Sequence, residues 1–221
     1  MKKVLIAPST DPCAIKDLTE YVKQLEKDGA DWIHCDIMDG KFVPKRTFDH
    51  LIFAFLRKAT SLPLDVHLMC SQPMAVAKDF IKYGADGITV HYEAFNDKIS
   101  LLTSLQELRS LGVRVGLSIK PETPVQKVEN LLNYLDLVLI MSVEPGKSGQ
   151  SFIKDSLIKI AYLSKKRSEL GLNFLIEVDG GVNETNASII TVSGADVLVS
   201  GNCVFLSENR RKTMEILRGE E

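Results

Sequence analysis

The chain has 221 residues, of which 45% are hydrophobic and 25% are charged, and its formal net charge is −2. This composition is typical of a globular protein with a large apolar core, and a slightly acidic chain lacks the basic face that nonspecific nucleic-acid binding needs. No apolar run approaches the roughly 20 residues of a membrane span, so we expect no nucleic-acid or membrane partner. The spacing of the four cysteines fits neither a metal site nor a disulfide framework, which favours a reducing cytoplasm.

Apolar, β-branched runs alternate with amphipathic stretches along the chain. Pro8 and Asp11 interrupt the first apolar run, which is therefore interpreted as a strand and not as a signal peptide. Strands are predicted over residues 4–9, 32–39, 64–70, 87–92, 113–119, 137–143, 173–179 and 197–201. Helices are predicted over residues 15–28, 49–59, 73–83, 98–111, 124–134, 152–170, 184–193 and 207–218. The helices show apolar stripes at helical spacing, and several end at a glycine.

The repeated alternation of strand and helix indicates the fold. The phrase Gly-Ala-Asp occurs just before three predicted strands, at residues 29–31, 84–86 and 194–196. Eight strands alternating with eight helices, with no Pro/Gly/Ser-rich linker, predict a single α/β domain over residues 1–221, a (β/α)8 TIM barrel. A doubly wound open sheet is the alternative. The even number of strands and the lack of a G-x-G-x-x-G motif after the first strand argue against it.

Polar residues alternate with apolar ones near the ends of three predicted strands. Strand side chains point alternately to two faces, so His34 and Asp36 share one face while Cys35 points to the other. His67 and Asp179 lie near the ends of two further strands, and chemistry in a (β/α)8 barrel sits at these carboxyl ends. Imidazole and carboxylate ligands suit Zn²⁺, Fe²⁺, Mn²⁺ or Co²⁺, and opposed carboxylates also suit proton transfer. The pattern predicts one divalent metal ion at the barrel mouth.

Two other histidines are less central. His91 ends a predicted strand and faces the same mouth, either in direct contact with the site or as a support for one of its ligands. His50 begins a predicted helix and is expected at the surface.

Glycine-rich segments follow the last three predicted strands. Glycine lets backbone N–H groups approach an anion closely, and barrels commonly hold a phosphate at these loops. A nucleotide-binding loop is excluded because Met141 stands where that motif requires glycine. The predicted phosphate-binding residues are Gly146, Lys147, Ser148, Gly149, Gly180, Gly181, Gly201 and Asn202.

Four strings of this sequence resemble the ribulose-phosphate 3-epimerase family. They are residues 34–44 (HCDIMDGKFVP), 65–69 (DVHLM), 141–146 (MSVEPG) and 177–182 (EVDGGV). The likeness runs over nearly the whole chain, from Ala7 to Gly201. It implies a cytoplasmic isomerase of the pentose phosphate pathway, a homo-oligomer that interconverts D-ribulose 5-phosphate and D-xylulose 5-phosphate. The small-molecule partner would be a ketose phosphate.

The resemblance also implies roles for individual residues. The metal ligands would be His34, Asp36, His67 and Asp179. Asp36 and Asp179 would move a proton on and off carbon 3 through an enediolate, each on its own face of the sugar. Ser9 and His67 would contact the substrate. A wall without hydrogen-bonding groups would be formed by Met38, Met69 and Met141.

Three loops depart from the family pattern: residues 10–14 (TDPCA), Lys147-Ser148 and Asn202. They leave open a 3-epimerase that acts on a hexulose phosphate such as D-allulose 6-phosphate. A non-catalytic sugar-phosphate-binding barrel is the alternative from another class, but it would have little reason to keep both Asp36 and Asp179. A decarboxylase or aldolase of the same superfamily would carry D-x-K-x-x-D on the third strand, where this chain has no lysine.

Overall fold

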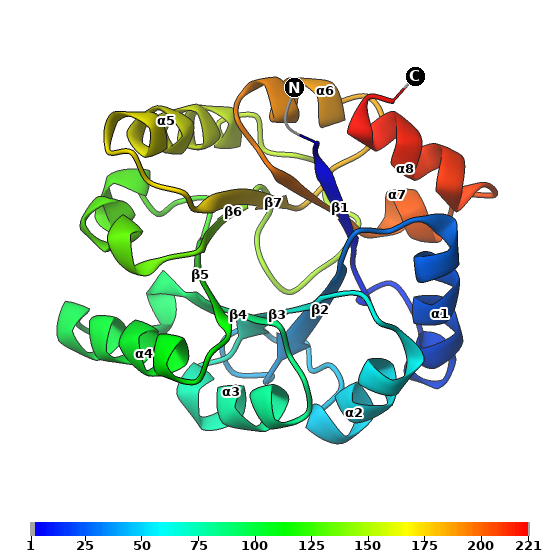
Figure 1. Ribbon diagram of the computed structural model, residues 1–221, viewed down its shortest axis with the longest axis horizontal. Helices are drawn as coiled ribbons and strands as arrows, with labels where there is room; N and C mark the ends of the chain where they lie inside the picture. The colour runs from blue at the N-terminus through cyan, green and yellow to red at the C-terminus, as the bar shows by residue number, and fades with distance from the viewer. Residues whose placement is uncertain (1–2, 221) are drawn as a thin grey trace.

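The computed structural model, which describes residues 3–220, contains eight parallel strands arranged as a nearly closed barrel with helices around it (Figure 1). The strands are β1 (Leu5–Pro8), β2 (Ile33–Met38), β3 (Leu64–Met69), β4 (Gly87–His91), β5 (Arg114–Ile119), β6 (Leu137–Met141), β7 (Leu175–Asp179) and β8 (Val197–Ser200). Their hydrogen-bonded order is β1-β8-β7-β6-β5-β4-β3-β2. Among the described residues, β1 and β2 meet in a single isolated bridge between Ser9 and His34. The predicted (β/α)8 barrel is confirmed.

The helices cover the outside of the barrel (Figure 1). They are α1 (Leu18–Asp28), α2 (His50–Ala59), α3 (Pro73–Lys82), α4 (Lys98–Ser110), α5 (Ser156–Glu169), α6 (Ala187–Val192), α7 (Asn202–Phe205) and α8 (Arg210–Arg218). Three segments are 3₁₀-helices: η1 (Ile15–Asp17), η2 (Tyr92–Ala94) and η3 (Val125–Tyr134). Within the described part of the chain, no helix is long and apolar enough to cross a bilayer.

Three helices differ from their predictions. The segment after β5 is 3₁₀ and not α, because its buried residues Val125, Val128 and Leu131 recur every third residue, the period of a 3₁₀-helix. Helix α5 begins at Ser156 and not at residue 152, since the N–H of Ile153 donates a 2.8 Å bond to the carbonyl of Ser142 and holds this segment against the end of β6. The four-residue α7 was not predicted.

The two faces of the strands have different surroundings. The outward-facing residues Ile33, Cys35 and Ile37 of β2 belong to the large core between strands and helices. The interior of the barrel is divided: apolar side chains from β1, β6 and β8 fill one part, and buried polar side chains from β2, β3, β4 and β7 fill the other. Buried polar groups are costly unless they find partners, so this polar part requires a specific network.

Candidate active site

A cavity of about 590 Å³ opens at the carboxyl ends of the strands. Its walls include Asp36 and Asp179 together with all of the predicted substrate-contacting residues except His67. Those residues are Ser9, Met38, Met69, Met141, Gly146, Lys147, Ser148, Gly149, Gly180, Gly181, Gly201 and Asn202. His34 and His67 are fully buried and lie outside the lining of this cavity.

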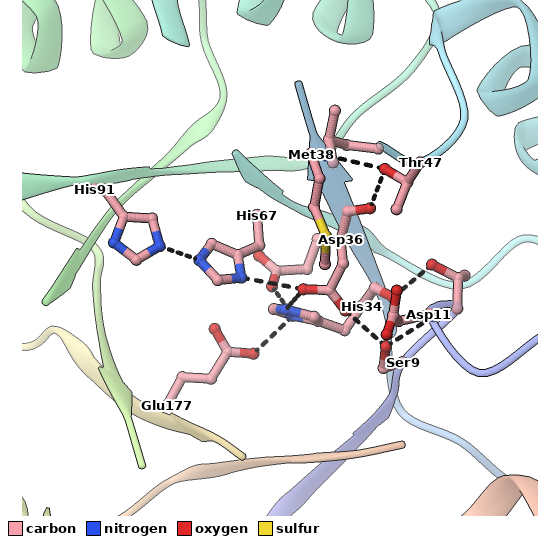
Figure 2. Close-up of polar contacts among 12 residues, drawn as sticks. Ser9, Asp11, His34, Asp36, Met38, Thr47, His67, His91 and Glu177 are labelled. Atoms are coloured by element: carbon pink, nitrogen blue, oxygen red, sulfur yellow. Dashed lines mark hydrogen bonds and ion pairs between the residues drawn. The ribbon is translucent and has the colours of Figure 1, made fainter. Parts of the chain in front are cut away.

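The four predicted metal ligands come together in the barrel mouth. His34, Asp36, His67 and Asp179 each offer one ligand atom, and these atoms lie within 4.8 Å of one another. The register of β2 and β3 pairs Asp36 with His67, and that of β6 and β7 pairs Met141 with Asp179. Asp36 Oδ1 lies 3.4 Å from His34 Nε2 and 3.2 Å from His67 Nδ1 (Figure 2).

The cluster fits a divalent cation. His34 Nε2 is buried and has no hydrogen-bond partner, although it points toward the carboxylate of Asp36. Burial alone would lower the pKa of His34, but the nearby Asp36 and Glu177 charges raise it well above its ordinary value. The surroundings therefore stabilise positive charge at this position. Two imidazole nitrogens and two carboxylates are a donor set that Zn²⁺, Fe²⁺, Mn²⁺ and Co²⁺ accept.

Neighbouring side chains fix the orientation of the cluster. His34 Nδ1 lies 2.9 Å from Oδ2 of Asp65, which leaves Nε2 toward Asp36. The hydroxyl of Ser9 donates a 2.6 Å bond to Oδ2 of Asp36. Thr47 joins the end of β2 to the following loop, because its hydroxyl donates to the carbonyl of Asp36 and accepts from the N–H of Met38. Asp36 is thus held from both sides.

The two carboxylates have opposite pKa shifts. Burial and the charge of Asp36 raise the pKa of Asp179 to about 8. Burial also acts to raise the pKa of Asp36, but the charge of His34 and the close contacts with both imidazoles hold it well below its ordinary value. In the metal-free protein the surroundings therefore favour the protonated form of Asp179 and the ionised form of Asp36. A bound cation would favour the ionised form of both.

Glu177 precedes Asp179 by two residues in β7 and therefore lies on the same face of the strand, deeper in the barrel. Figure 2 shows its carboxylate directed toward the ring of His34. Its Oε1 is 3.4 Å from His34 Nδ1, and neither of its oxygens has a hydrogen-bond partner. Burial and the charge of Asp65 raise its pKa to about 7. No role was predicted for Glu177 from the sequence.

The other two histidines, His91 and His50, lie outside the four-residue cluster. Nε2 of His91 lies 2.9 Å from Nε2 of His67, a predicted ligand, so His91 contacts the cluster from behind that residue. His50 begins α2 and stacks on Tyr83, with ring centroids 5.5 Å apart, away from the mouth.

Sequence reasoning missed a charged contact across the mouth. Asp11, in the loop after β1, lines the cavity, and its Oδ1 lies 2.5 Å from Nζ of Lys45 in the loop after β2. Burial and the charge of Asp36 raise the pKa of Asp11. The sequence did show a charged residue directly after a strand end, and this was the available signal.

The glycine-rich loops pack closely. Gly181 adopts a φ of +66°, and a Cβ atom there would lie 2.5 Å from the backbone nitrogen of Phe152. The loop after β7 therefore passes directly against the segment after β6, which is possible only without a side chain. This contact keeps two of the three predicted phosphate loops together.

The fold and the site together define an enzyme of the (β/α)8-barrel class with a carboxylate–imidazole cluster at the barrel mouth. Comparison with known proteins is more specific. The chain belongs to the ribulose-phosphate 3-epimerase family, whose family model matches residues 5–205. The resemblance seen in the sequence is confirmed.

Individual relatives agree. The chain is 46% identical over 202 residues to the chloroplastic ribulose-5-phosphate-3-epimerase of Arabidopsis thaliana, covering 91% of this chain and 72% of that protein. It is 42% identical to the ribulose-phosphate 3-epimerase of Bacillus subtilis, covering 99% of this chain and 100% of that protein. The 3-hexulose-6-phosphate synthase structure from Salmonella typhimurium has the same fold, with a TM-score of 0.72 at 13% identity, covering 98% of this chain and 97% of that one.

Proposed function

We propose that this protein is an isomerase that interconverts D-ribulose 5-phosphate and D-xylulose 5-phosphate by inverting carbon 3. Family membership and the names of the relatives support the reaction. The observation that carries the proposal is the convergence of Asp36 and Asp179 in one cavity that also contains the glycine-rich loops. In this proposal residues 1–221 form one catalytic domain, which acts in the cytoplasm as a homo-oligomer.

Asp36 and Asp179 would perform the proton transfers. They come from β2 and β7, and both line the cavity in which carbon 3 would lie. One carboxylate would remove the proton from one face of the sugar while the other carboxyl group returns a proton to the opposite face, and the roles would exchange in the reverse direction. An ordinary aspartate, with a pKa of about 3.9, is a weak base for a carbon acid, so the enediolate needs further stabilisation.

His34, Asp36, His67 and Asp179 would hold one divalent ion, and any of Zn²⁺, Fe²⁺, Mn²⁺ and Co²⁺ suits these ligands. When bound, this ion would supply a Lewis acid that stabilises negative charge on the ketone and hydroxyl oxygens beside carbon 3. Ser9 would keep Asp36 oriented through its 2.6 Å hydrogen bond.

The rest of the cavity would bind the sugar phosphate. Met38, Met69 and Met141 would form a wall that offers the reactive carbon no competing proton donor. The phosphate would be bound by backbone N–H groups of the loops after β6, β7 and β8. Those loops contain Gly146, Lys147, Ser148, Gly149, Gly180, Gly181, Gly201 and Asn202.

Isotope exchange tests the reaction. In heavy water, the metal-loaded protein should introduce solvent deuterium at carbon 3 of D-ribulose 5-phosphate while forming D-xylulose 5-phosphate. The same assay with D-allulose 6-phosphate decides between pentulose and hexulose substrates. Faster turnover of D-allulose 6-phosphate would indicate that the hexulose phosphate is the substrate. Binding of either compound without exchange would indicate a non-catalytic barrel and refute the enzyme.

A further inference from the structure

A line of hydrogen-bonded side chains leads from His67 away from the cavity. His67 Nε2 lies 2.9 Å from Nε2 of His91, and His91 Nδ1 lies 3.1 Å from Oε2 of Glu93. Both imidazole side chains are completely buried. On the other side of His67, Nδ1 lies 3.2 Å from Oδ1 of Asp36 (Figure 2). Glu93 is therefore connected to the metal cluster through two rings.

Glu93 is placed as a hydrogen-bond acceptor. It lies in η2, directly after β4, and its Oε1 accepts bonds from the backbone N–H of Lys120, at 2.8 Å, and from the hydroxyl of Thr123. Burial acts to raise the pKa of Glu93, but the bonds from His91, Thr123 and Lys120 outweigh it and lower the pKa to about 2. At neutral pH Glu93 is ionised and has no proton to donate to His91.

The surroundings keep this carboxylate and His91 in place. Lys159 of α5 donates hydrogen bonds to the carbonyl oxygens of Lys120 and Thr123, at 3.0 and 2.8 Å, and so fixes the segment that holds Glu93. Phe42 packs over His91, with ring centroids 4.8 Å apart. Glu93 cannot turn away from His91 without breaking its own bonds to the N–H of Lys120 and the hydroxyl of Thr123.

The acceptor at one end determines the hydrogen positions along the line. A neutral imidazole has one N–H and one lone pair, so a partner at one nitrogen sets the role of the other. Because Glu93 accepts, His91 carries its hydrogen on Nδ1, and its Nε2 accepts from Nε2 of His67. The 2.9 Å contact between the two Nε2 atoms holds a single hydrogen, which His67 supplies. His67 is left with a lone pair on Nδ1.

That lone pair faces another acceptor. His67 Nδ1 and Asp36 Oδ1 are 3.2 Å apart, and two lone pairs at this distance repel each other unless a cation lies between them. Asp65 orients His34 in the same way, since it lies at Nδ1 of that ring and leaves Nε2 toward Asp36. When a cation displaces the proton that the raised pKa favours on His34, both imidazoles would present lone pairs to one point, which is the arrangement that a metal ion requires.

We propose that Glu93 is a positioning residue that, acting through His91, fixes the tautomer of His67 in which Nδ1 faces the cation site. The inference rests on the metal site of the proposed function and gives a role to a residue that does not line the cavity. The N–H of Lys120 and the hydroxyl of Thr123 fix where the carboxylate lies, and its negative charge makes Glu93 the acceptor.

Histidine ¹⁵N NMR of the metal-free protein near neutral pH tests the proposal directly, because the nitrogen shifts distinguish the two tautomers. In the unmodified protein, His67 should carry its hydrogen on Nε2 and His91 on Nδ1. Glu93→Gln introduces an amide that can donate to His91, so a population of His67 with hydrogen on Nδ1 should emerge, while His50 serves as an unchanged reference. An unmodified protein with hydrogen on Nδ1 of His67 would overturn the proposal without any variant.

Metal affinity gives a second measurement. In a titration with Co²⁺ alone, Glu93→Gln should bind about 10- to 100-fold more weakly than the unmodified protein. Thr123→Val is the matched control: it removes a bond to the same carboxylate but keeps the charge, so the tautomer and affinity should be retained. Equal losses in both variants would indicate a packing effect and overturn the proposal. Neither the NMR measurement nor the Co²⁺ titration uses a substrate. If the protein proved inactive on ketose phosphates, the proposed function would be refuted, but these two measurements would still test the role of Glu93.

Discussion

Asp36 and Asp179 are the same type of side chain in two different electrostatic settings. Asp36 is surrounded by two imidazoles and the hydroxyl of Ser9, which favour its ionised form. Asp179 is half-buried in the cavity wall, and its low solvation and the neighbouring carboxylates favour its protonated form. Such a pair is suited to exchanging protons with one substrate from two sides.

Replacing one of the two aspartates should block inversion of carbon 3 but still allow its proton to exchange with solvent in one of the two epimers. Asp179→Asn should lower interconversion by about 10³-fold or more, in line with general acid–base contributions. Exchange of solvent deuterium should persist only for the epimer whose proton faces Asp36, and Asp36→Asn should show the opposite preference. Steady-state assays and NMR of carbon 3 measure both effects. Asp155→Asn, at an exposed position, is the control; near-normal turnover in Asp179→Asn would contradict the assigned role.

A third aspartate determines a pH dependence of stability. Asp39 accepts hydrogen bonds from the N–H groups of Lys41, Phe42 and Ser71 and from the Ser71 hydroxyl. Burial acts to raise the pKa of Asp39, but these bonds outweigh it and lower the pKa to about 2. Because the folded-state pKa is below the ordinary value of about 3.9, the contribution to stability is complete above that value and is lost as the pH falls toward 2.

Asp39→Asn should therefore reduce the free energy of unfolding by about 1 kcal/mol at neutral pH, a modest amount because solvent screens this group. The difference between the variant and the unmodified protein should shrink as the pH falls from about 4 toward 2. Urea unfolding at several pH values measures it. A difference that stays constant over this range would mean that the charge of Asp39 is not responsible.

At the scale of elements, the loops after the strands are joined to one another over the mouth. Asp11 and Lys45 connect the loops after β1 and β2, and Gly181 brings the loop after β7 against Phe152. The geometry of the cavity therefore depends on contacts between loops as well as on the strands below them.

Two glycine variants test whether the geometry of the cavity depends on the contact between the loops after β6 and β7. Gly181 and Gly171 have nearly the same φ, +66° and +62°, but a Cβ atom at Gly171 would meet nothing within 4 Å. Both alanine variants should lose about 1 kcal/mol to the left-handed backbone. Only Gly181→Ala should also displace the loops and raise the KM for the ketose phosphate. Urea unfolding and steady-state kinetics measure the two effects; equal KM values would contradict the contact.

At the scale of the whole molecule, metal binding should be linked to folding. A ligand that binds only the folded state stabilises it by about 4 kcal/mol at a thousandfold excess over its Kd. Treatment with a chelator should therefore lower the Tm and abolish activity, and Co²⁺ or Zn²⁺ should restore both. Asp179→Asn should show a smaller shift in Tm on metal addition. A Tm that does not respond to the chelator would argue against a metal held by this cluster.

The sequence revealed those features that depend on local periodicity. The alternation of side chains along β2 placed His34 and Asp36 inside the barrel, and the order of strands and helices predicted the fold. Contacts between loops distant in sequence carried no such signal: Asp11 meets Lys45, and Glu93 meets Thr123, only because parallel strands bring their ends together. The 3₁₀ form of η3 was visible in its three-residue spacing but was interpreted as an α-helix.

The seam between the first two strands lies beside the active site. Ser9 forms the isolated bridge to His34 and also donates the hydrogen bond to Asp36, so one residue both joins the first two strands and supports a predicted proton-transfer group. If β1 separated locally from β2, its pairing with β8 would keep it in the sheet, but Asp36 would lose the hydroxyl of Ser9. We therefore expect local opening between these two strands to lower activity while the rest of the barrel stays folded.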